Sequence, residues 1–368
     1  MITSHVYISK SSMVDIVLLF LTLAGQVRAK FTCKSDGHFG DENDCTKFYH
    51  CANGRAMGGF CPAGLLWNQA TQQCDWPSMT DCDFTIEKAK QLQVESPTIL
   101  YLTFDDGPNL GTTELLDALK AHNIRATFFI NDDNLEITEK RNETQVLENA
   151  NNLVRIVAEG HMVADHSYDH MKHNSDGPKD AYQDISNDIS YFGPRNAAPA
   201  LYLLKKAGFE EATINFVNYT LNYFVRMPYS NNWRVGLDNG RAISADCLEC
   251  TVPASSSRKA VKIADVLAKE YGVQVFGWDM EWSMNFNTNR IKYGGTPMFM
   301  RLGTGAHSKQ KGKIVLLCHD IAFRPHEITG SLSAQEELLE FLDLAKNAGY
   351  QFKTLDTYYM DEPQTQSV

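Results

Sequence analysis

The chain has 368 residues, of which 43% are apolar, and its formal net charge is −11. This length accommodates two domains or one large barrel, and the apolar fraction is ordinary for a globular protein. The negative charge argues against nucleic acid and against an anionic membrane surface as binding partners.

Residues 1–29 have the pattern of a secretory signal peptide. Lys10 precedes an apolar run from Ile16 to Leu23, and Val27-Arg28-Ala29 offers a cleavage site that would leave Lys30 first. A membrane anchor or a disordered tail is the alternative, but the run is far shorter than the roughly 20 residues of a spanning helix. We therefore expect a secreted, extracellular protein without membrane association. Two glycosylation acceptors would then be usable: Asn142-Glu143-Thr144 and Asn218-Tyr219-Thr220.

A cluster of cysteines marks a small domain that we expect to span residues 30–84. So short a segment cannot easily bury enough surface to fold without cross-links, and an even number of cysteines behind a signal peptide indicates disulfides. Zinc is the alternative, but the segment contains no Cys-x-x-Cys pair. The six cysteines are Cys33, Cys45, Cys51, Cys61, Cys74 and Cys82.

The surroundings of these cysteines resemble a peritrophin-A type chitin-binding domain. The resemblance is carried by DCTKFYHC at residues 44–51, CPAGLLWN at 61–68 and CDWP at 74–77. It implies chitin as the ligand and three disulfides: Cys33–Cys51, Cys45–Cys82 and Cys61–Cys74.

The aromatic residues of this domain have two readings. One set could offer flat faces to sugar rings, the usual way to hold an uncharged polysaccharide: Phe48, Tyr49, Trp67 and Trp76. Alternatively, Phe48, Tyr49 and Trp67 form the small core of the domain. We favour the core for Phe48 and leave Trp67 and Trp76 open.

Three further cysteines lie outside the cluster. Cys247 and Cys250 could form a short local disulfide in a loop, which we prefer to a redox or metal site. Cys318 lies in an apolar run and is expected to be a buried free thiol.

A polar linker, residues 85–97, separates the small domain from a large one, residues 98–360, and residues 361–368 form a polar tail. In the large domain strand-like and helix-like runs alternate, which predicts an α/β fold with parallel strands. Strands are expected over residues 99–104, 126–130, 161–164, 223–225, 273–276, 314–317 and 351–354. Helices are expected over residues 113–122, 146–159, 200–207, 261–271 and 334–348, the third with Pro199 at its first position.

Five short motifs lie at or just after these strands. In (β/α) barrels the active site is built from the carboxyl ends of strands, so the motifs would meet at one mouth. An open doubly wound sheet also places its sites at strand ends, and the sequence leaves that alternative open. The motifs are TFDDGP at residues 103–108, HSYDH at 166–170, RMPY at 226–229, WDMEW at 278–282 and LCHD at 317–320.

Asp106, His166 and His170 are the expected metal ligands. Two histidines and one carboxylate leave coordination positions open for water and substrate, as a catalytic site requires. This nitrogen and oxygen set suits Zn²⁺ best, although Co²⁺ or Mn²⁺ would also fit. Two histidines at this spacing could simply be surface residues, but the preceding Asp-Asp-Gly-Pro turn favours the metal site.

Three further residues are expected to act beside the metal in amide hydrolysis: Asp105, Arg226 and His319. Neighbouring residues at a strand end point in different directions, so Asp105 could act as general base while Asp106 binds metal. Arg226 would pair with Asp105 and keep it ionised. His319 would protonate the departing amine, since histidine titrates near neutral pH. The alternative readings are that Asp105 belongs to a polar turn, that Arg226 is an exposed arginine and that His319 caps its strand.

Motif for motif, residues 98–357 resemble the polysaccharide deacetylase family (NodB-homology, carbohydrate esterase family 4). The resemblance implies a distorted (β/α) barrel of about seven strands. It also implies that the backbone N–H of Tyr229 helps to hold the oxyanion. An acid, either Asp279 or Glu281, would tune the catalytic histidine.

The expected substrate-binding residues of the large domain are Trp282, Leu317 and Pro228. Trp282 would line the groove, although Trp278 and Trp282 could equally belong to the core. Leu317 would line a pocket for the acetyl methyl group. Two less familiar stretches, residues 173–222 and 283–311, are expected to shape the groove.

Taken together, the two resemblances imply a metal-dependent chitin deacetylase, which the signal peptide predicts to be secreted and which we expect to be a monomer. It would hydrolyse the N-acetyl groups of chitin or chitooligosaccharides and release acetate. One alternative is a non-catalytic chitin-binding matrix protein, and another is a deacetylase of a different polymer such as xylan or peptidoglycan. A serine esterase is disfavoured because no G-x-S-x-G sequence occurs.

Overall fold

The computed structural model describes residues 31–41, 47–61, 66–75, 98–138, 141–170, 188–235, 254–305, 308, 312–325 and 332–358. The predicted signal peptide, linker and C-terminal tail lie outside these residues. Cys45, Cys82, Trp76, Cys247 and Cys250 lie outside them as well. Within the described ranges, no helix is both long and apolar enough to cross a membrane.

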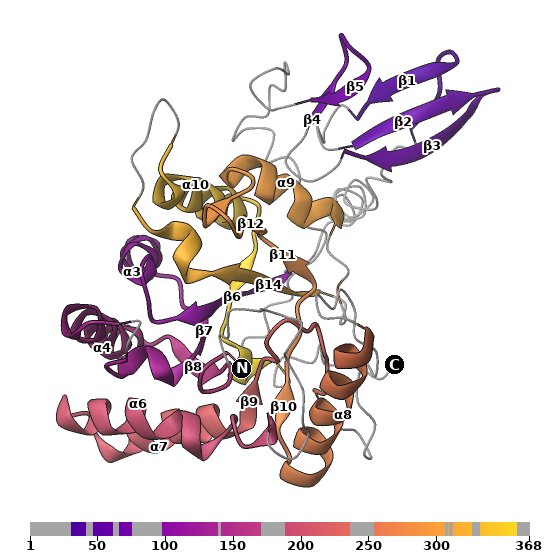
Figure 1. Ribbon diagram of the computed structural model, residues 1–368. Coiled ribbons are helices and arrows are strands. Elements are labelled where there is room, and N and C mark those ends of the chain that lie inside the picture. The colour runs from indigo at the N-terminus through magenta and orange to yellow at the C-terminus, as the bar shows by residue number, and fades with distance from the viewer. Residues whose placement is uncertain are drawn as a thin grey trace, which may run out of the picture.

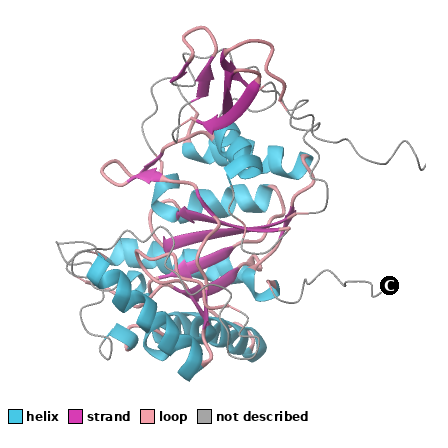
Figure 2. Cartoon of the chain, turned by 90° about the vertical axis from the view of Figure 1, so that its right-hand side faces the viewer, coloured by secondary structure: helices cyan, strands magenta, loops and turns pink. Residues whose placement is uncertain are grey.

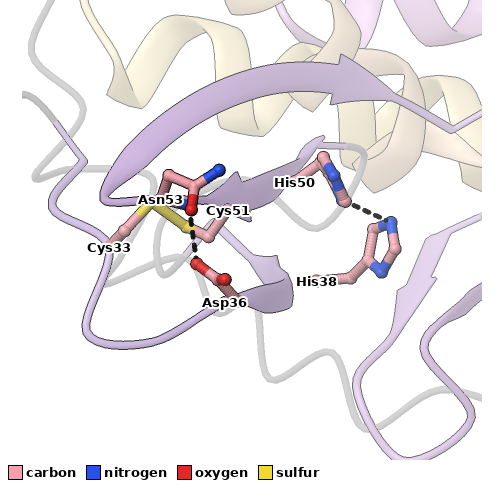
Figure 3. Close-up of a disulfide and its surroundings, with 6 residues drawn as sticks. All are labelled: Cys33, Asp36, His38, His50, Cys51 and Asn53. Atoms are coloured by element: carbon pink, nitrogen blue, oxygen red, sulfur yellow. Dashed lines mark hydrogen bonds between the residues drawn. A yellow bond between two sulfur atoms is a disulfide. The ribbon is translucent and has the colours of Figure 1, made fainter.

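The N-terminal domain consists of two small antiparallel sheets held by disulfides. One sheet contains β1 (Gly37–Gly40), β2 (Lys47–Ala52) and β3 (Arg55–Phe60), and the other contains β4 (Leu66–Asn68) and β5 (Gln73–Asp75). The disulfides Cys33–Cys51 and Cys61–Cys74 confirm two of the expected pairs. Figure 3 shows the first of them beside Asn53, whose N–H donates to Asp36, and beside the paired rings of His38 and His50.

Trp67 belongs to the core of this domain, which is the second of the two readings left open for it. It is only 8% exposed, and its ring stacks on Phe48 at a centroid distance of 4.6 Å. Tyr49 is half-buried, because Phe31 stacks on its ring at 3.9 Å and its hydroxyl donates to Asp41. A domain this small needs its large aromatic side chains as core.

The large domain is built on a curled parallel sheet whose strands run in the order β10-β9-β8-β7-β6-β14-β11, with β15 beside β6. From β6 the strand order runs through β7, β8, β9 and β10 on one side, and through β14 back to β11 on the other. Strands that are consecutive in sequence are therefore placed one after another around the barrel. The fold is a singly wound, distorted (β/α) barrel and not a doubly wound sheet. The strands are β6 (Ile99–Gly107), β7 (Thr127–Ile130), β8 (Met162–Asp165), β9 (Phe224–Val225), β10 (Gln274–Val275), β11 (Met280–Glu281), β14 (Lys313–His319) and β15 (Gln351–Phe352).

The barrel is open between β10 and β11. These strands follow each other along the chain but do not pair, and no helix separates them. A parallel neighbour needs a crossover of a dozen or more residues, which the short connection from Val275 to Met280 does not supply.

Helices surround the curled sheet, as Figures 1 and 2 show. They are α3 (Thr112–Ala121), α4 (Glu143–Ala158), α6 (Pro194–Lys206), α7 (Glu211–Tyr223), α8 (Ala254–Tyr271), α9 (Gly295–Gly305) and α10 (Ala334–Asn347). The connections also contain the hairpin strands β12 (Met284–Asn285) and β13 (Arg290–Ile291) and the short 3-10 helices η2 (Asp132–Leu135), η4 (Asp320–Phe323) and η5 (Leu355–Thr357).

Successive residues of the strands alternate between two cores. On β6, Leu100, Leu102 and Phe104 pack between the sheet and the helices, whereas Tyr101 faces the barrel interior. The interior core also receives Phe129, Ala164, Phe224, Val315 and Leu317 from the other strands and Phe276 from just after β10. Because side chains alternate along a strand, Thr103 and Asp105 continue the interior row of β6.

The expected strands and helices form, but several boundaries differ, among them the start of α8 at Ala254 and not at residue 261. Helix α6 starts at Pro194, not at Pro199, which lies inside the helix. Proline lacks only an N–H that the first turn would leave unpaired, so Pro194 can begin the helix. Helix α4 starts three residues early because Asn142 and Gln145 form a capping box. Helices α7 and α9 were not expected, and Asn218 is exposed on α7.

His161, just before β8, should make the fold sensitive to acid. Burial lowers the pKa of His161 from 6.5 to about 4, because the ring packs edge-on against Phe128 and its Nδ1 accepts the Ala126 N–H. Between these pH values the unfolded chain binds a proton that the folded chain does not, so stability falls as pH falls. The loss should reach about 3 kcal/mol.

His161→Asn keeps an acceptor near the position of Nδ1 but does not titrate. Urea unfolding at pH 7 and pH 4.5 should therefore show a smaller loss of unfolding free energy for the variant than for the parent. Equal losses would show that His161 does not account for the acid sensitivity.

Candidate metal centre and active site

Polar side chains from four strands meet at the carboxyl end of the barrel. Asp105 and Asp106 end β6, His166 follows β8, Arg226 follows β9, and His319 ends β14. His319 is in register with Asp105 on the neighbouring strand. Residues more than 200 positions apart in the sequence are thereby adjacent, as the motif positions predicted.

Asp106, His166 and His170 form a cluster that could hold a metal ion, since one ligand atom of each lies within 4.8 Å of the others. Oδ1 of Asp106 is 3.4 Å from Nε2 of His166 and 3.3 Å from Nε2 of His170. This oxygen is buried and has no hydrogen-bond partner among the described residues. A divalent cation would supply the missing interaction, so the three side chains fit such an ion.

The ring orientation of His166 suits a metal ligand. Its Nδ1 lies 2.8 Å from the carbonyl oxygen of Arg226. A carbonyl only accepts, so Nδ1 donates and the lone pair of Nε2 faces Asp106. Burial alone would lower the pKa of His166, but the Asp105 and Asp106 carboxylates raise it above its usual value.

Asp106 is ionised despite its enclosure. Burial alone would raise the pKa of Asp106, but the imidazoles of His170, His166 and His319 hold it well below its usual range. A carboxylate that is ionised at neutral pH is what a cation requires.

Asp105 is held by a buried ion pair with Arg226. The Nη1 atom of Arg226 donates to Oδ1 of Asp105 at 2.8 Å and to the Thr103 hydroxyl at 2.7 Å. Both charged residues are at most 2% exposed. The other carboxylate oxygen, Oδ2, lies 3.6 Å from Nε2 of His166, so Asp105 faces the metal cluster.

Left-handed backbone conformations are concentrated in these motifs. The φ angles are 71° at Asp106, 66° at Ser167, 52° at His170 and 58° at Tyr229. Such conformations are costly for non-glycine residues and persist only where the surrounding structure enforces them. Here they turn the functional side chains toward one another at the barrel mouth.

Three polar residues that the sequence analysis missed support these turns. Asn131, after β7, donates to the carbonyls of His166 and Ser167 at 2.7 and 2.8 Å. Asn134 donates to the Asp106 carbonyl at 2.8 Å, and Asp165 accepts the N–H of Ser167 at 2.6 Å. Asn131 could have been found, because it is a polar residue directly after a buried strand, like the motif residues themselves.

Asp320 lies beneath the Asp-Asp-Gly turn and was also missed. A Cβ atom on Gly107 would lie 2.2 Å from Oδ2 of Asp320, so glycine is required there. The Thr112 hydroxyl donates to the same carboxyl group. Burial raises the pKa of Asp320 to about 8 despite this bond, and the Asp106 and Asp105 charges add to the effect.

Tyr229 and Pro228 lie on the histidine side of the mouth. The Tyr229 ring packs edge-on against His170, with 4.4 Å between the ring centroids. Burial, with the charges of Asp106 and Asp169, raises the pKa of Tyr229 to about 12, so its hydroxyl stays protonated. Pro228 is buried in the turn before it.

Nδ1 of His319 is buried without a hydrogen-bond partner among the described residues, so neither acid of the fourth motif bonds to that nitrogen. Asp279 is 7% exposed, and its Oδ2 accepts the Val315 N–H at 2.8 Å. Glu281 is in register with Leu317, two residues before His319. The expectation that one of these acids tunes the histidine stays a prediction.

Trp282 does not line a groove, so that expectation is wrong. It is 1% exposed, contacts Phe323 and Phe341, and donates from Nε1 to the Tyr293 carbonyl at 2.9 Å. Leu317 faces the barrel interior and is 3% exposed. Cys318 is a buried free thiol, as expected.

Comparison with known proteins finds two families along the chain. Residues 33–82 match the chitin binding peritrophin-A domain, and residues 93–194 match the polysaccharide deacetylase family. A chitin disaccharide deacetylase of Vibrio alginolyticus is 30% identical over an alignment of 323 residues that covers 72% of this chain and 72% of the relative.

Two further relatives match shorter stretches. A chitin deacetylase of Colletotrichum lindemuthianum is 40% identical over 79 residues, or 22% of this chain and 29% of the relative. A probable chitinase 10 of Drosophila melanogaster is 38% identical over 66 residues, or 18% of this chain and 3% of the relative. With the Vibrio relative matched over most of both chains, this protein belongs to the polysaccharide deacetylase family and carries a peritrophin-A chitin-binding domain ahead of its barrel.

Proposed function

We propose that this protein is a secreted, metal-dependent chitin deacetylase, which hydrolyses the N-acetyl group of N-acetylglucosamine units and releases acetate. The observation that carries the proposal is the meeting of Asp105, Asp106, His166, His170 and His319 at one mouth of the barrel. Secretion is supported by the apolar leader sequence and by the disulfides of the N-terminal domain.

Asp106, His166 and His170 would hold the metal ion, with Zn²⁺ the first choice for this ligand set and Co²⁺ or Mn²⁺ as alternatives. When bound, the ion would polarise the acetamide carbonyl and lower the pKa of a bound water. The carbonyl of Arg226 keeps the His166 ring in the tautomer that this ligation needs.

Asp105 would remove a proton from the attacking water as general base. Arg226 occupies its Oδ1, which leaves Oδ2 on the side of the metal ligands. His319, in register with Asp105, would return a proton to the departing amine. The Tyr229 N–H would help to stabilise the oxyanion, and Leu317 would bound the acetyl methyl group.

Chitin is the preferred substrate because of the peritrophin-A domain, which would raise the local concentration of the barrel on an insoluble polymer. A peptidoglycan-N-acetylglucosamine deacetylase of Bacillus cereus is 35% identical over 105 residues, 27% of this chain and 34% of the relative. Another acetylated polysaccharide is therefore the second candidate. Binding to chitin but not to peptidoglycan would favour the first, and the reverse would favour the second.

Acetate release from N-acetylglucosamine oligomers should stop when a chelator is added and return with Zn²⁺. Asp105→Asn should lower kcat about 10²–10⁴-fold, the usual contribution of a general base, while the metal content stays at the parent level. Near-parental turnover by this variant would refute the role of Asp105. No release by the parent, with chitin binding intact, would favour a non-catalytic matrix protein.

His170→Ala and His166→Ala should each lose metal, because each removes one of three ligands. We expect affinity for Zn²⁺ to fall by more than the roughly 10–100-fold that loss of an outer-shell partner costs. Elemental analysis after dialysis against limiting Zn²⁺ measures this directly. His122→Ala is the matched control, since His122 pairs with Asp343 far from the cluster in the fold. Unchanged metal content in both ligand variants would contradict the assignment.

A further inference from the structure

The hairpin β12–β13 carries an aromatic residue that its own turn does not require. Its four-residue loop runs from Phe286 to Asn289 and is closed by Asn285, whose carbonyl accepts the N–H groups of Thr288 and Asn289. The Asn285 side chain accepts the Asn287 N–H at 2.9 Å. Polar residues therefore make the turn, and position 286 could be any exposed residue.

Phe286 nevertheless places a bare ring beside the proposed general acid. It is 67% exposed, and its ring lies edge-on to that of His319, with 6.0 Å between the centroids. Other strongly exposed aromatic residues of the described chain, such as Tyr202, Phe216 and Tyr271, lie on the outer helices α6, α7 and α8. A single exposed apolar side chain is ordinary, so it is the position of Phe286 that matters.

The hairpin that carries Phe286 is anchored at both of its ends. Arg324, at the end of η4, donates to the Thr288 carbonyl at 3.2 Å. The carbonyl of Tyr293 accepts the indole N–H of Trp282, which is buried in the core. Since η4 starts directly after His319, the same element fixes the hairpin and the histidine relative to each other.

The order of strands gives the direction in which a polymer would meet this ring. The metal ligands come from β6 and β8, His319 from the next strand β14, and the hairpin follows β11 at the edge of the sheet. A polysaccharide that has one acetamide group at the metal ligands and that extends past His319 would therefore reach Phe286. Sugar rings have apolar C–H faces, and an exposed aromatic ring on an anchored hairpin is suited to cover such a face.

We propose that Phe286 is a substrate-positioning residue that stacks on a sugar ring neighbouring the unit that is deacetylated. The inference rests on the proposed function, which it extends by assigning a binding position outside the reacting centre. Phe286 does not touch the reacting atoms, so its contribution is to affinity and to orientation of the polymer.

The test measures binding separately from turnover. In an Asp105→Asn background loaded with Zn²⁺, calorimetry with the N-acetylglucosamine tetramer should show about tenfold weaker binding for Phe286→Ala, the effect of 1.4 kcal/mol. Phe286→Trp should retain affinity because it keeps a flat ring. Phe216→Ala, which removes an exposed ring from α7, is the matched control and should bind like the parent.

Kinetics with Asp105 intact should then show a higher KM for the tetramer in Phe286→Ala, with little change in kcat and in metal content. Unchanged binding in Phe286→Ala, or an equal loss in Phe216→Ala, would overturn the inference. Tetramer binding too weak to detect in the Asp105→Asn parent would overturn it as well. Absence of acetate release by the parent would instead contradict the proposed function, while the binding comparison would still report on Phe286.

Discussion

The buried guanidinium of Arg226 is the interaction on which the site depends. Its N–H groups reach the Asp105 carboxylate, the Thr103 hydroxyl and the carbonyls of Phe276 and Gly277, and its Cζ atom lies 4.2 Å from the centroid of the Phe129 ring. Burying such a charge costs several kcal/mol unless its donors are satisfied, and here the acceptors lie on β6 and on the segment that follows β10. The main chain of the same residue takes part as well, since its carbonyl orients His166. One residue thus holds both the proposed base and a proposed metal ligand.

The position of Arg226 follows from the geometry of parallel strands. Alternate residues of each strand enter the barrel, so the interior row of β6 passes from Tyr101 through Thr103 to Asp105. The lower part of this row is apolar and closes the barrel with side chains. The upper part is polar because the strands end there and their last residues face one another. The same alternation brings His319 to the mouth from β14.

The sequence predicted this arrangement well because the relevant signals are local. A buried strand followed by a polar motif identifies a residue at a strand end, and parallel strands bring such ends together. Whether a single aromatic residue is exposed or buried is harder to predict from the sequence. Trp67 and Trp282 are both in the core, which is decided by partners such as Phe48 and Phe341 that are remote in sequence. Asp165 and Asp320 were missed for the same reason, because their supporting roles depend on contacts between distant segments. Helix α7 and the hairpin at Phe286 lie in stretches without a recognised pattern.

The most direct test of the account is to locate the metal. Crystals of the protein grown with Zn²⁺ would be measured at the zinc absorption edge, where anomalous scattering identifies the ion. The account predicts an anomalous peak within bonding distance, roughly 2.0–2.2 Å, of Asp106 oxygen and of Nε2 of His166 and His170. A fully occupied ion bound elsewhere, with these three side chains bonded only to protein or water, would contradict it.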